Sequence, residues 1–148
     1  MAHQLAWRKT MLGLAVALGC LATARAAEQD LDKGKDGDIM FVTPSDNIGC
    51  HYIPKGGTST YQPMTGGPEL QCDRVEPAYV AVFLDHKGKA VKTENPGEQG
   101  CCSLEQKLVY GNSWSEGPFT CLSARIGLTC TSSDGHGFFI SKSKITVH

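Results

Sequence analysis

The segment FTCLSARIGLTCTS (residues 119–132) contains the clearest fold signal in the chain, an alternating pattern on both sides of a turn. Alternate positions share one face of each strand: Phe119, Cys121 and Ser123, and then Leu128, Cys130 and Ser132. Gly127 suits the left-handed position of a three-residue hairpin loop. This arrangement sets Cys121 nearly opposite Cys130, as a cross-strand disulfide requires.

Short strands separated by turns continue the pattern on either side of this hairpin, and no segment shows sustained helical periodicity. Residues 78–84 are apolar on both faces, so we expect a central, buried strand there. Residues 138–147 carry Lys142 and Lys144, which is typical of an edge strand protected against pairing with other molecules. The sequence therefore predicts an all-β fold, a small disulfide-stabilised antiparallel sandwich or partly open barrel built from hairpins.

The seven cysteines divide into one and six. Cys20 lies inside an apolar N-terminal stretch, whereas the other six lie in the rest of the chain: Cys50, Cys72, Cys101, Cys102, Cys121 and Cys130. An even set of six suits a disulfide framework that forms in an oxidising compartment.

The N-terminal segment has the features of a signal peptide over residues 1–26. Arg8 and Lys9 precede an apolar run of about a dozen residues, and Ala24 and Ala26 have the spacing that signal peptidase recognises. The run is short of the ~20 residues that cross a bilayer as a helix, so we expect no permanent membrane span. Alternatively, the residues before Cys20 loosely resemble a lipoprotein cleavage site, with Cys20 as the lipidated residue. Both interpretations predict a secreted or periplasmic protein.

The remaining chain divides into an acidic, flexible lead-in over residues 27–38 and a single disulfide-stabilised β domain over residues 39–148. Without the leader, 11 basic residues face 15 acidic ones, a formal net charge of −4. A weakly acidic domain is a poor candidate for binding nucleic acid. The lead-in is not an EF-hand loop, because the twelfth position counted from Asp30 is Phe41 rather than a carboxylate.

Six motifs resemble, in their order, a family of short secreted bacterial proteins that is common in actinobacteria and has a domain of unknown function. They are FVTPSDNIGC (41–50), QCD (71–73), LVYG (108–111), FTC (119–121), GLTC (127–130) and GHGFF (135–139). The family has no established activity, so the resemblance implies the compartment and the fold and leaves the function open.

The middle cysteines depart from that family's pattern, in which two cysteines are separated, because Cys101 and Cys102 are adjacent. We expect Cys50 to pair with Cys72, and Cys121 with Cys130. Two alternatives remain for Cys101 and Cys102, a strained vicinal disulfide or reshuffling with Cys50 and Cys72.

No set of residues in the sequence matches a known catalytic motif, and we expect no catalytic residue, no cofactor and no metal. The serines lack a Gly-x-Ser-x-Gly elbow, and the cysteines lack the repeated two-residue spacing of zinc modules. The carboxylates that a hydrolase needs are scattered along the sequence: Asp46, Asp73, Glu76 and Asp134.

Trp114 and His136 are the candidate binding residues. Trp114 lies in a polar segment, residues 111–117, that can expose it as an aromatic anchor. Alternatively, Trp114 folds back over the core, and His136 between two glycines is a turn residue. The leading hypothesis is a non-catalytic binding module for an envelope or extracellular protein or glycan. The alternatives are an inhibitor of an extracellular hydrolase such as lysozyme and a carboxylate-based cell-wall hydrolase.

Overall fold

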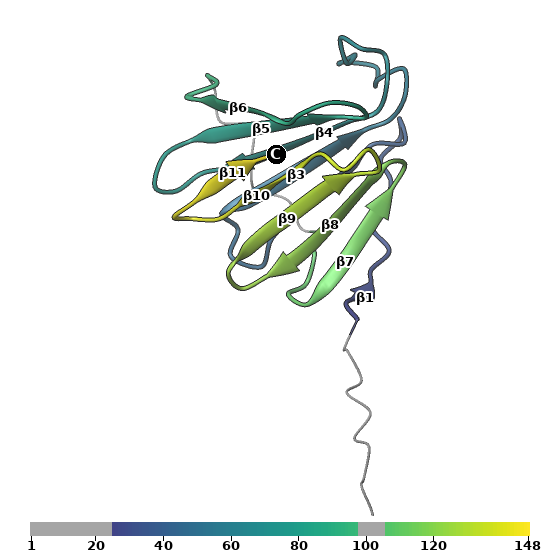
Figure 1. The fold of residues 1–148 in the computed structure, drawn as a ribbon. Helices are drawn as coiled ribbons and strands as arrows, with labels where there is room; N and C mark the ends of the chain where they lie inside the picture. Colours follow the sequence, from purple (N-terminus) through teal and green to yellow (C-terminus); the bar gives the residue numbers. More distant parts are fainter. Residues whose placement is uncertain (1–24, 98–105) are drawn as a thin grey trace, which may run out of the picture.

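The computed structural model describes residues 25–97 and 106–148, which form two stacked β-sheets (Figure 1). The five-stranded sheet has sequential order, with β2 (Ile39–Val42), β3 (Ile48–Ile53), β4 (Glu69–Arg74), β5 (Val80–Asp85) and β6 (Val91–Glu94). The six-stranded sheet has the order β1 (Ala27–Glu28), β7 (Asn112–Glu116), β8 (Phe119–Ala124), β9 (Gly127–Ser132), β10 (Gly137–Ile140) and β11 (Ile145–Val147). The prediction of an all-β fold is confirmed, and the sheets form a sandwich rather than a closed barrel.

Neighbouring strands pair antiparallel throughout, except that β1 pairs parallel with β7. The strand expected over residues 78–84 is β5, which has a partner on both sides but lies next to the edge strand β6. Ala81, Val82 and Leu84 are fully buried, and Phe83 is half-buried. The interior position therefore explains the apolar sequence of β5, although the strand is not at the centre of its sheet.

The inner faces of the two sheets meet in one hydrophobic core. Both described disulfides lie within it and join cysteines at paired positions of adjacent strands, Cys50–Cys72 in β3 and β4 and Cys121–Cys130 in β8 and β9. The two predicted pairings are confirmed. The predictions for residues 1–24, which include Cys20, and for Cys101 and Cys102 lie outside the described residues.

The prediction of one edge strand over residues 138–147 is wrong, because a turn divides this segment into β10 and β11. The Ser141 hydroxyl closes that turn by accepting a hydrogen bond from the Lys144 amide (3.0 Å) and donating one to the Lys144 carbonyl (3.1 Å). Ser141 therefore provides a local alternative to strand pairing for the backbone at this point.

The hairpin at residues 119–132 has a tighter turn than the sequence predicts. Gly127 pairs with Ala124, which leaves Arg125 and Ile126 as a two-residue turn. Glycine is needed here for two reasons: its φ is 149°, which residues with a side chain rarely adopt, and a Cβ there would lie 2.6 Å from the Phe139 ring.

The acidic segment expected as a flexible lead-in, residues 27–38, is bonded to both sheets. β1 extends the six-stranded sheet, and Lys33 forms an ion pair with Glu116 of β7 (2.8 Å). The Asp36 carboxylate accepts hydrogen bonds from the amide (2.8 Å) and hydroxyl (2.6 Å) of Ser59, between β3 and β4. Several polar side chains of the segment 27–38 are thus fixed by hydrogen bonds to the rest of the domain.

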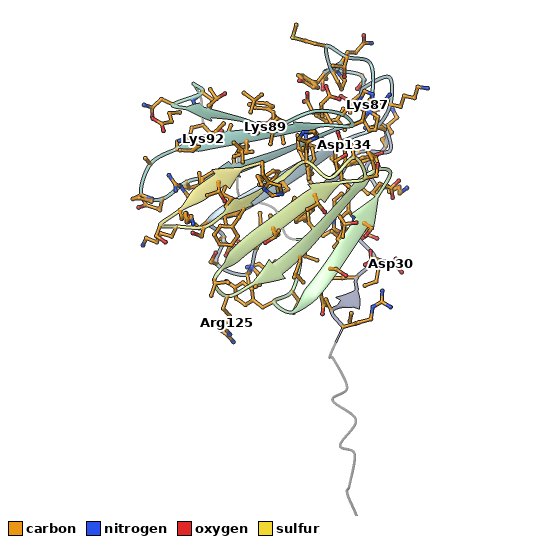
Figure 2. All side chains as sticks on the ribbon, in the orientation of Figure 1. Asp30, Lys87, Lys89, Lys92, Arg125 and Asp134 are labelled. Atoms are coloured by element: carbon orange, nitrogen blue, oxygen red, sulfur yellow. A yellow bond between two sulfur atoms is a disulfide. The ribbon has the colours of Figure 1, made fainter. Side chains whose placement is uncertain are left out.

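The turns between β5 and β6 and between β9 and β10 meet at one end of the sandwich, where Lys87 and Asp134 are labelled in Figure 2. The Gly88 amide donates a hydrogen bond of 2.7 Å to the Asp134 carboxylate. This contact links the two sheets at the end that lies away from the candidate site.

Candidate functional site

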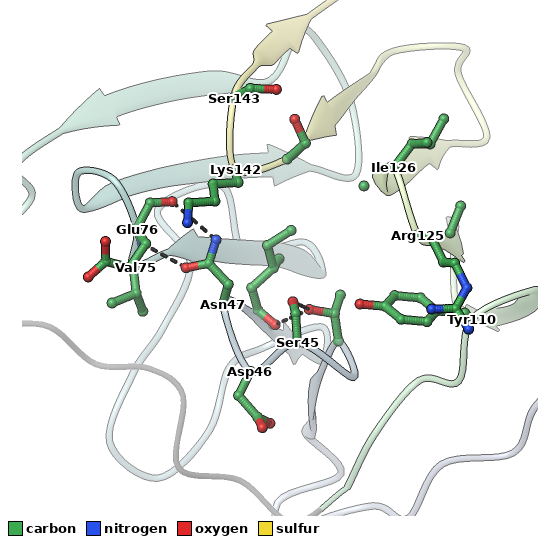
Figure 3. Close-up of a pocket in the computed structure, with 15 residues that line it drawn as sticks. Ser45, Asp46, Asn47, Val75, Glu76, Tyr110, Arg125, Ile126, Lys142 and Ser143 are labelled. Atoms are coloured by element: carbon green, nitrogen blue, oxygen red, sulfur yellow. Dashed lines mark hydrogen bonds between the residues drawn. The ribbon is translucent and has the colours of Figure 1, made fainter.

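A cleft of about 570 Å³ lies at the opposite end of the sandwich, where turns from both sheets converge (Figure 3). Its walls come from the β2–β3 turn, the β4–β5 connection, Tyr110 in the turn before β7, and the β8–β9 and β10–β11 turns. The lining residues are Thr43, Ser45, Asp46, Asn47, Ile48, Val75, Glu76, Tyr110, Ala124, Arg125, Ile126, Gly127, Ser141, Lys142 and Ser143. Loops that a rigid scaffold holds together in this way are common sites of binding.

Arg125 and Tyr110 form the most distinctive pair in this end cleft. The Arg125 guanidinium carbon lies 5.4 Å from the centre of the Tyr110 ring, within the range of a cation–π contact. Figure 3 shows the Tyr110 hydroxyl directed toward Ser45 on the other sheet. The ring therefore positions the guanidinium, while the donor groups of Arg125 remain available to a ligand.

Two cations, Arg125 and Lys142, and two carboxylates, Asp46 and Glu76, line the end cleft. Within residues 25–97 and 106–148, neither Arg125 nor Lys142 has an acidic partner. Asp46 is engaged in an ion pair with Lys107 (2.9 Å), and the carboxylates of Asp46 and Glu76 point away from the Arg125 and Tyr110 side chains in Figure 3. The part of the cleft beside Tyr110 therefore favours an anionic ligand.

Arg74 adds a third positive charge directly behind the cleft wall. This side chain of β4 is buried, and its guanidinium donates to the carbonyls of Ser141 (3.2 Å), Lys142 (3.3 Å) and Ala78 (3.2 Å). The hydrogen bond and charge of Lys92 lower the pKa of Glu94, and the charge of Arg74 makes a smaller contribution. Arg74 thus attaches the β10–β11 turn to the other sheet and places Lys142 at the cleft.

Side-chain hydrogen bonds also hold the β2–β3 turn in one conformation. Asn47 accepts a bond from the Glu76 amide (2.7 Å) and donates one to the Glu76 carbonyl (3.1 Å). The hydroxyls of Thr43 and Ser45 lie 3.1 Å apart. Asp46 has a left-handed φ of 56°, a conformation that aspartate tolerates. The floor of the cleft is therefore preorganised, which lowers the entropic cost of binding.

The hypothesis that Trp114 is an exposed anchor is wrong, since Trp114 is only 2% exposed. It occupies an inward position of β7 opposite Cys121, and its ring centroid lies 5.1 Å from that of Phe41 and 6.0 Å from that of Tyr52. The polar neighbours of Trp114 suggested a turn, but they face outward from a strand. The alternative interpretation, in which Trp114 covers the core, agrees with this position.

His136 lies on the β9–β10 turn, at the end of the sandwich away from the cleft. Its Nδ1 is 2.9 Å from an Asp134 carboxylate oxygen. The Gly88 amide, followed by the side chain and amide of His136, lowers the pKa of Asp134. The structure therefore does not bring the two candidate binding residues, Trp114 and His136, together with the cleft.

A pair of carboxylates with different pKa shifts lies on β4 and β5. Glu69 and Asp85 are paired across these strands. Burial raises the pKa of Glu69, to which the Tyr61 hydroxyl donates a bond of 2.8 Å. Burial also acts on Asp85, but hydrogen bonds from Thr65 and His86 lower its pKa overall. Two carboxyl groups with opposite shifts are a pattern that acid–base catalysis uses.

The structure contains no group of three His, Cys, Asp or Glu side chains placed to hold a metal ion within the residues that it describes. Across the same residues, no helix is long and apolar enough to cross a bilayer.

The cleft itself was not predicted, because its key residues are far apart in the sequence. Tyr110, Arg125 and Lys142 lie in three separate turns, and no spacing rule connects them. The available signal was weak, because only Arg125 lies in a predicted hairpin loop, whereas Lys142 was predicted within an edge strand. Comparison of the chain with models of protein families, with curated proteins and with solved structures finds no match. The resemblance to secreted actinobacterial proteins stays a prediction.

Proposed function

We propose that this protein is a non-catalytic binding module of the periplasm or the extracellular space, and that its end cleft binds a carboxylate group of an envelope or extracellular partner. One observation carries the proposal: Arg125 and Lys142 line the same cleft with no acidic partner in the described parts of the chain. A cation that lines a cleft and forms no ion pair within the protein favours a ligand that supplies a negative charge.

The chemistry of the cleft suits a carboxylate attached to a larger molecule. Arg125 presents a planar fork that matches the two carboxylate oxygens, and Lys142 supplies a second charge. The hydroxyls of Ser45 and Tyr110 offer neutral hydrogen bonds nearby. Ile126, 79% exposed at the rim, provides apolar contact for the rest of the ligand. This combination of charge, hydroxyls and one apolar group fits an acidic sugar or a peptide end.

The two described disulfides support the proposed compartment. Cys50–Cys72 joins two strands of the five-stranded sheet, and Cys121–Cys130 joins two strands of the six-stranded sheet. Structural disulfides of this kind persist in oxidising compartments and are rare in the cytosol. They support the proposed location in the periplasm or outside the cell.

Calorimetric titration with tetragalacturonate, a soluble chain of acidic sugars, and with a short acetylated peptide that has a free C-terminal carboxylate tests the proposal. We expect the wild type to bind at least one probe and the Arg125→Gln and Lys142→Gln variants to bind it about tenfold more weakly or worse, since each loses a charge-assisted hydrogen bond. Raising the salt concentration weakens binding as well.

Lys144→Gln is the matched control, because Lys144 lies on the same turn as Lys142 but does not line the cleft. It should bind the probe as the wild type does. Failure of the wild type to bind either probe, or equal loss in the variants of Lys142 and Lys144, contradicts the proposal.

A carboxylate-based cell-wall hydrolase is the second candidate, and the opposite pKa shifts of Glu69 and Asp85 are the observation that favours it. The raised pKa of Glu69 suits a proton donor, and the lowered pKa of Asp85 suits an ionised partner. Release of soluble fragments from purified peptidoglycan, abolished in Glu69→Gln but not in Arg125→Gln, would support this second candidate over binding alone.

A further inference from the structure

The edges of the two sheets differ in how they are protected against pairing with another strand. The edge of β2 is covered, because the Val42 amide donates a hydrogen bond to the Gln106 carbonyl (2.9 Å) and the Val42 carbonyl accepts one from Leu108 (3.0 Å). The edge strand β1 has only two residues, of which one is the charged Glu28. Covering segments, very short edge strands and charged residues all hinder edge-to-edge pairing.

The edge strand β6 is protected by charges on its inward side. Lys92 is paired with Val82, a residue of the hydrophobic core, and Glu94 lies on the same side of the strand two residues further along. The two charged side chains form an ion pair of 2.8 Å with each other. Inward-pointing charges disfavour the addition of a strand, because the added strand would take them out of water.

The edge strand β11 has none of these protections. Its residues, Ile145, Thr146 and Val147, include no charged residue and no proline, and all three favour strands. The lysines that the sequence analysis expected to protect this edge, Lys142 and Lys144, lie in the turn before the strand. Ile145 and Val147 are only half-buried where they pack against the core. Among the sheet edges of residues 25–97 and 106–148, β11 is therefore the one open to pairing.

The free side of β11 presents the backbone groups of Ile145 and Val147. Gly137 and His148 exchange two backbone hydrogen bonds of 3.0 Å between β10 and the end of β11. In an antiparallel ladder, such hydrogen-bonded pairs alternate with pairs whose N–H and C=O groups point away from each other. Val147 and Ile145, one and three positions before His148, belong to the second kind of pair. Their amides and carbonyls therefore face away from β10.

We propose that β11 pairs antiparallel with β11 of a second copy of this chain, about a two-fold axis at Thr146. In this register Ile145 of each copy lies opposite Val147 of the other, and each pair exchanges both of its backbone hydrogen bonds. The side chains of Ile145 and Val147 meet on the inner side and lose contact with water. Thr146 lies opposite Thr146 of the other copy on the outer side, a favourable cross-strand pair. The segment thus complements itself, as a symmetric dimer requires.

This pairing joins the six-stranded sheets of the two copies into one continuous sheet. Because the paired strands are antiparallel, the second copy is turned end for end. The β10–β11 turn, which precedes β11, lines the end cleft. The two end clefts therefore lie at opposite ends of the dimer. The contact itself uses none of the residues that line the cleft, so dimerisation is independent of the carboxylate binding proposed above.

Sedimentation velocity of the purified protein at concentrations from about 5 to 500 µM tests the dimer. We expect a reversible equilibrium between monomer and dimer in this range. Thr146→Lys should weaken dimerisation about tenfold or more, because it places two like charges opposite each other at the axis. An equal mixture of the Thr146→Lys and Thr146→Glu variants should restore the dimer, since opposite charges then face each other.

Val147→Pro is a second variant, because it removes an outward-facing amide and no hydrogen bond between β10 and β11. It should also favour the monomer. Thr120→Lys is the control, since it adds the same charge at an exposed position of β8, a strand with a partner on both sides. It should dimerise as the wild type does, and thermal unfolding checks that each variant is folded.

Three results overturn the inference. The first is a wild type that stays monomeric over the whole concentration range. The second is a dimer that Thr120→Lys dissociates as much as Thr146→Lys, or that neither Thr146→Lys nor Val147→Pro weakens. The third is a mixture of the two charged Thr146 variants that forms no more dimer than either variant alone.

Discussion

Trp114 of the six-stranded sheet packs against Phe41 of the five-stranded sheet, with ring centroids 5.1 Å apart and planes inclined by 53°. Both side chains are buried, and Tyr52 contacts the Trp114 ring edge-on. Aromatic pairs in this geometry contribute beyond their buried area. The contact therefore joins the two sheets and makes Trp114 a core residue.

Trp114→Ala should destabilise the fold by about 3–5 kcal/mol, because it removes the largest side chain between the sheets and leaves a cavity. Urea unfolding followed by circular dichroism measures the effect. Leu122→Ala, which truncates an exposed residue of the neighbouring strand, should change the free energy of unfolding by only about 0.5 kcal/mol. An unchanged midpoint for Trp114→Ala would contradict this role.

Replacing both cysteines of either described disulfide by alanine should reduce the free energy of unfolding by about 3 kcal/mol, since each bridge closes a loop that is otherwise free in the unfolded chain. The separations are 9 residues for Cys121–Cys130 and 22 for Cys50–Cys72. The longer loop predicts a loss that is larger by about 0.5–1 kcal/mol for Cys50–Cys72. Losses below about 1 kcal/mol for both pairs would show that the cross-links are not structural.

Arg74→Met should cost about 1–3 kcal/mol, because it leaves the carbonyls of Ser141, Lys142 and Ala78, of which the first is buried, without their donor. It should also weaken binding of the cleft probe, since Arg74 attaches the turn that carries Lys142. Denaturation and calorimetric titration of the same variant measure the two effects. Lys144→Met, on the exposed side of that turn, should alter neither quantity.

The lowered pKa of the Asp134 carboxyl group predicts that the protein loses stability in acid. Hydrogen bonds from Gly88 and His136 lower the pKa of its carboxyl in the folded state. A lowered pKa gives a stabilisation that is present above the ordinary pKa of about 4 and is lost as the pH falls through the folded value. The melting temperature of Asp134→Asn should therefore lie below that of the wild type near neutral pH and approach it in acid. Parallel pH profiles would rule out this contribution.

The sequence predicted the features that depend on local alternation. Cys121 and Cys130 lie opposite each other because both belong to one hairpin, so counting alternate residues was enough to pair them. The same rule failed for Trp114, whose serine neighbours indicated a turn although they form the outward side of β7. The strand propensity of a residue does not distinguish the polar face of a strand from a loop unless the neighbouring strands are known.

The end cleft was beyond sequence reasoning because it depends on how two sheets stack. Ser45 and Arg125 belong to different sheets, and only the stacking brings their turns to the same end. Side-chain bonds across the stack, such as those from Arg74 to the β10–β11 turn, have no counterpart in the sequence pattern. The predicted fold class and disulfide pairs were therefore more accurate than the predicted site.

Mapping of backbone amide chemical shifts in the nitrogen-15-labelled protein during titration with tetragalacturonate tests the central claim most directly, because it locates the bound probe. Our account predicts that the largest shifts occur at residues 43–47, 110, 124–127 and 141–143, and that Lys142→Gln reduces them while Lys144→Gln does not. Shifts concentrated elsewhere, such as around Glu69, with the residues of the cleft unchanged, would contradict the claim.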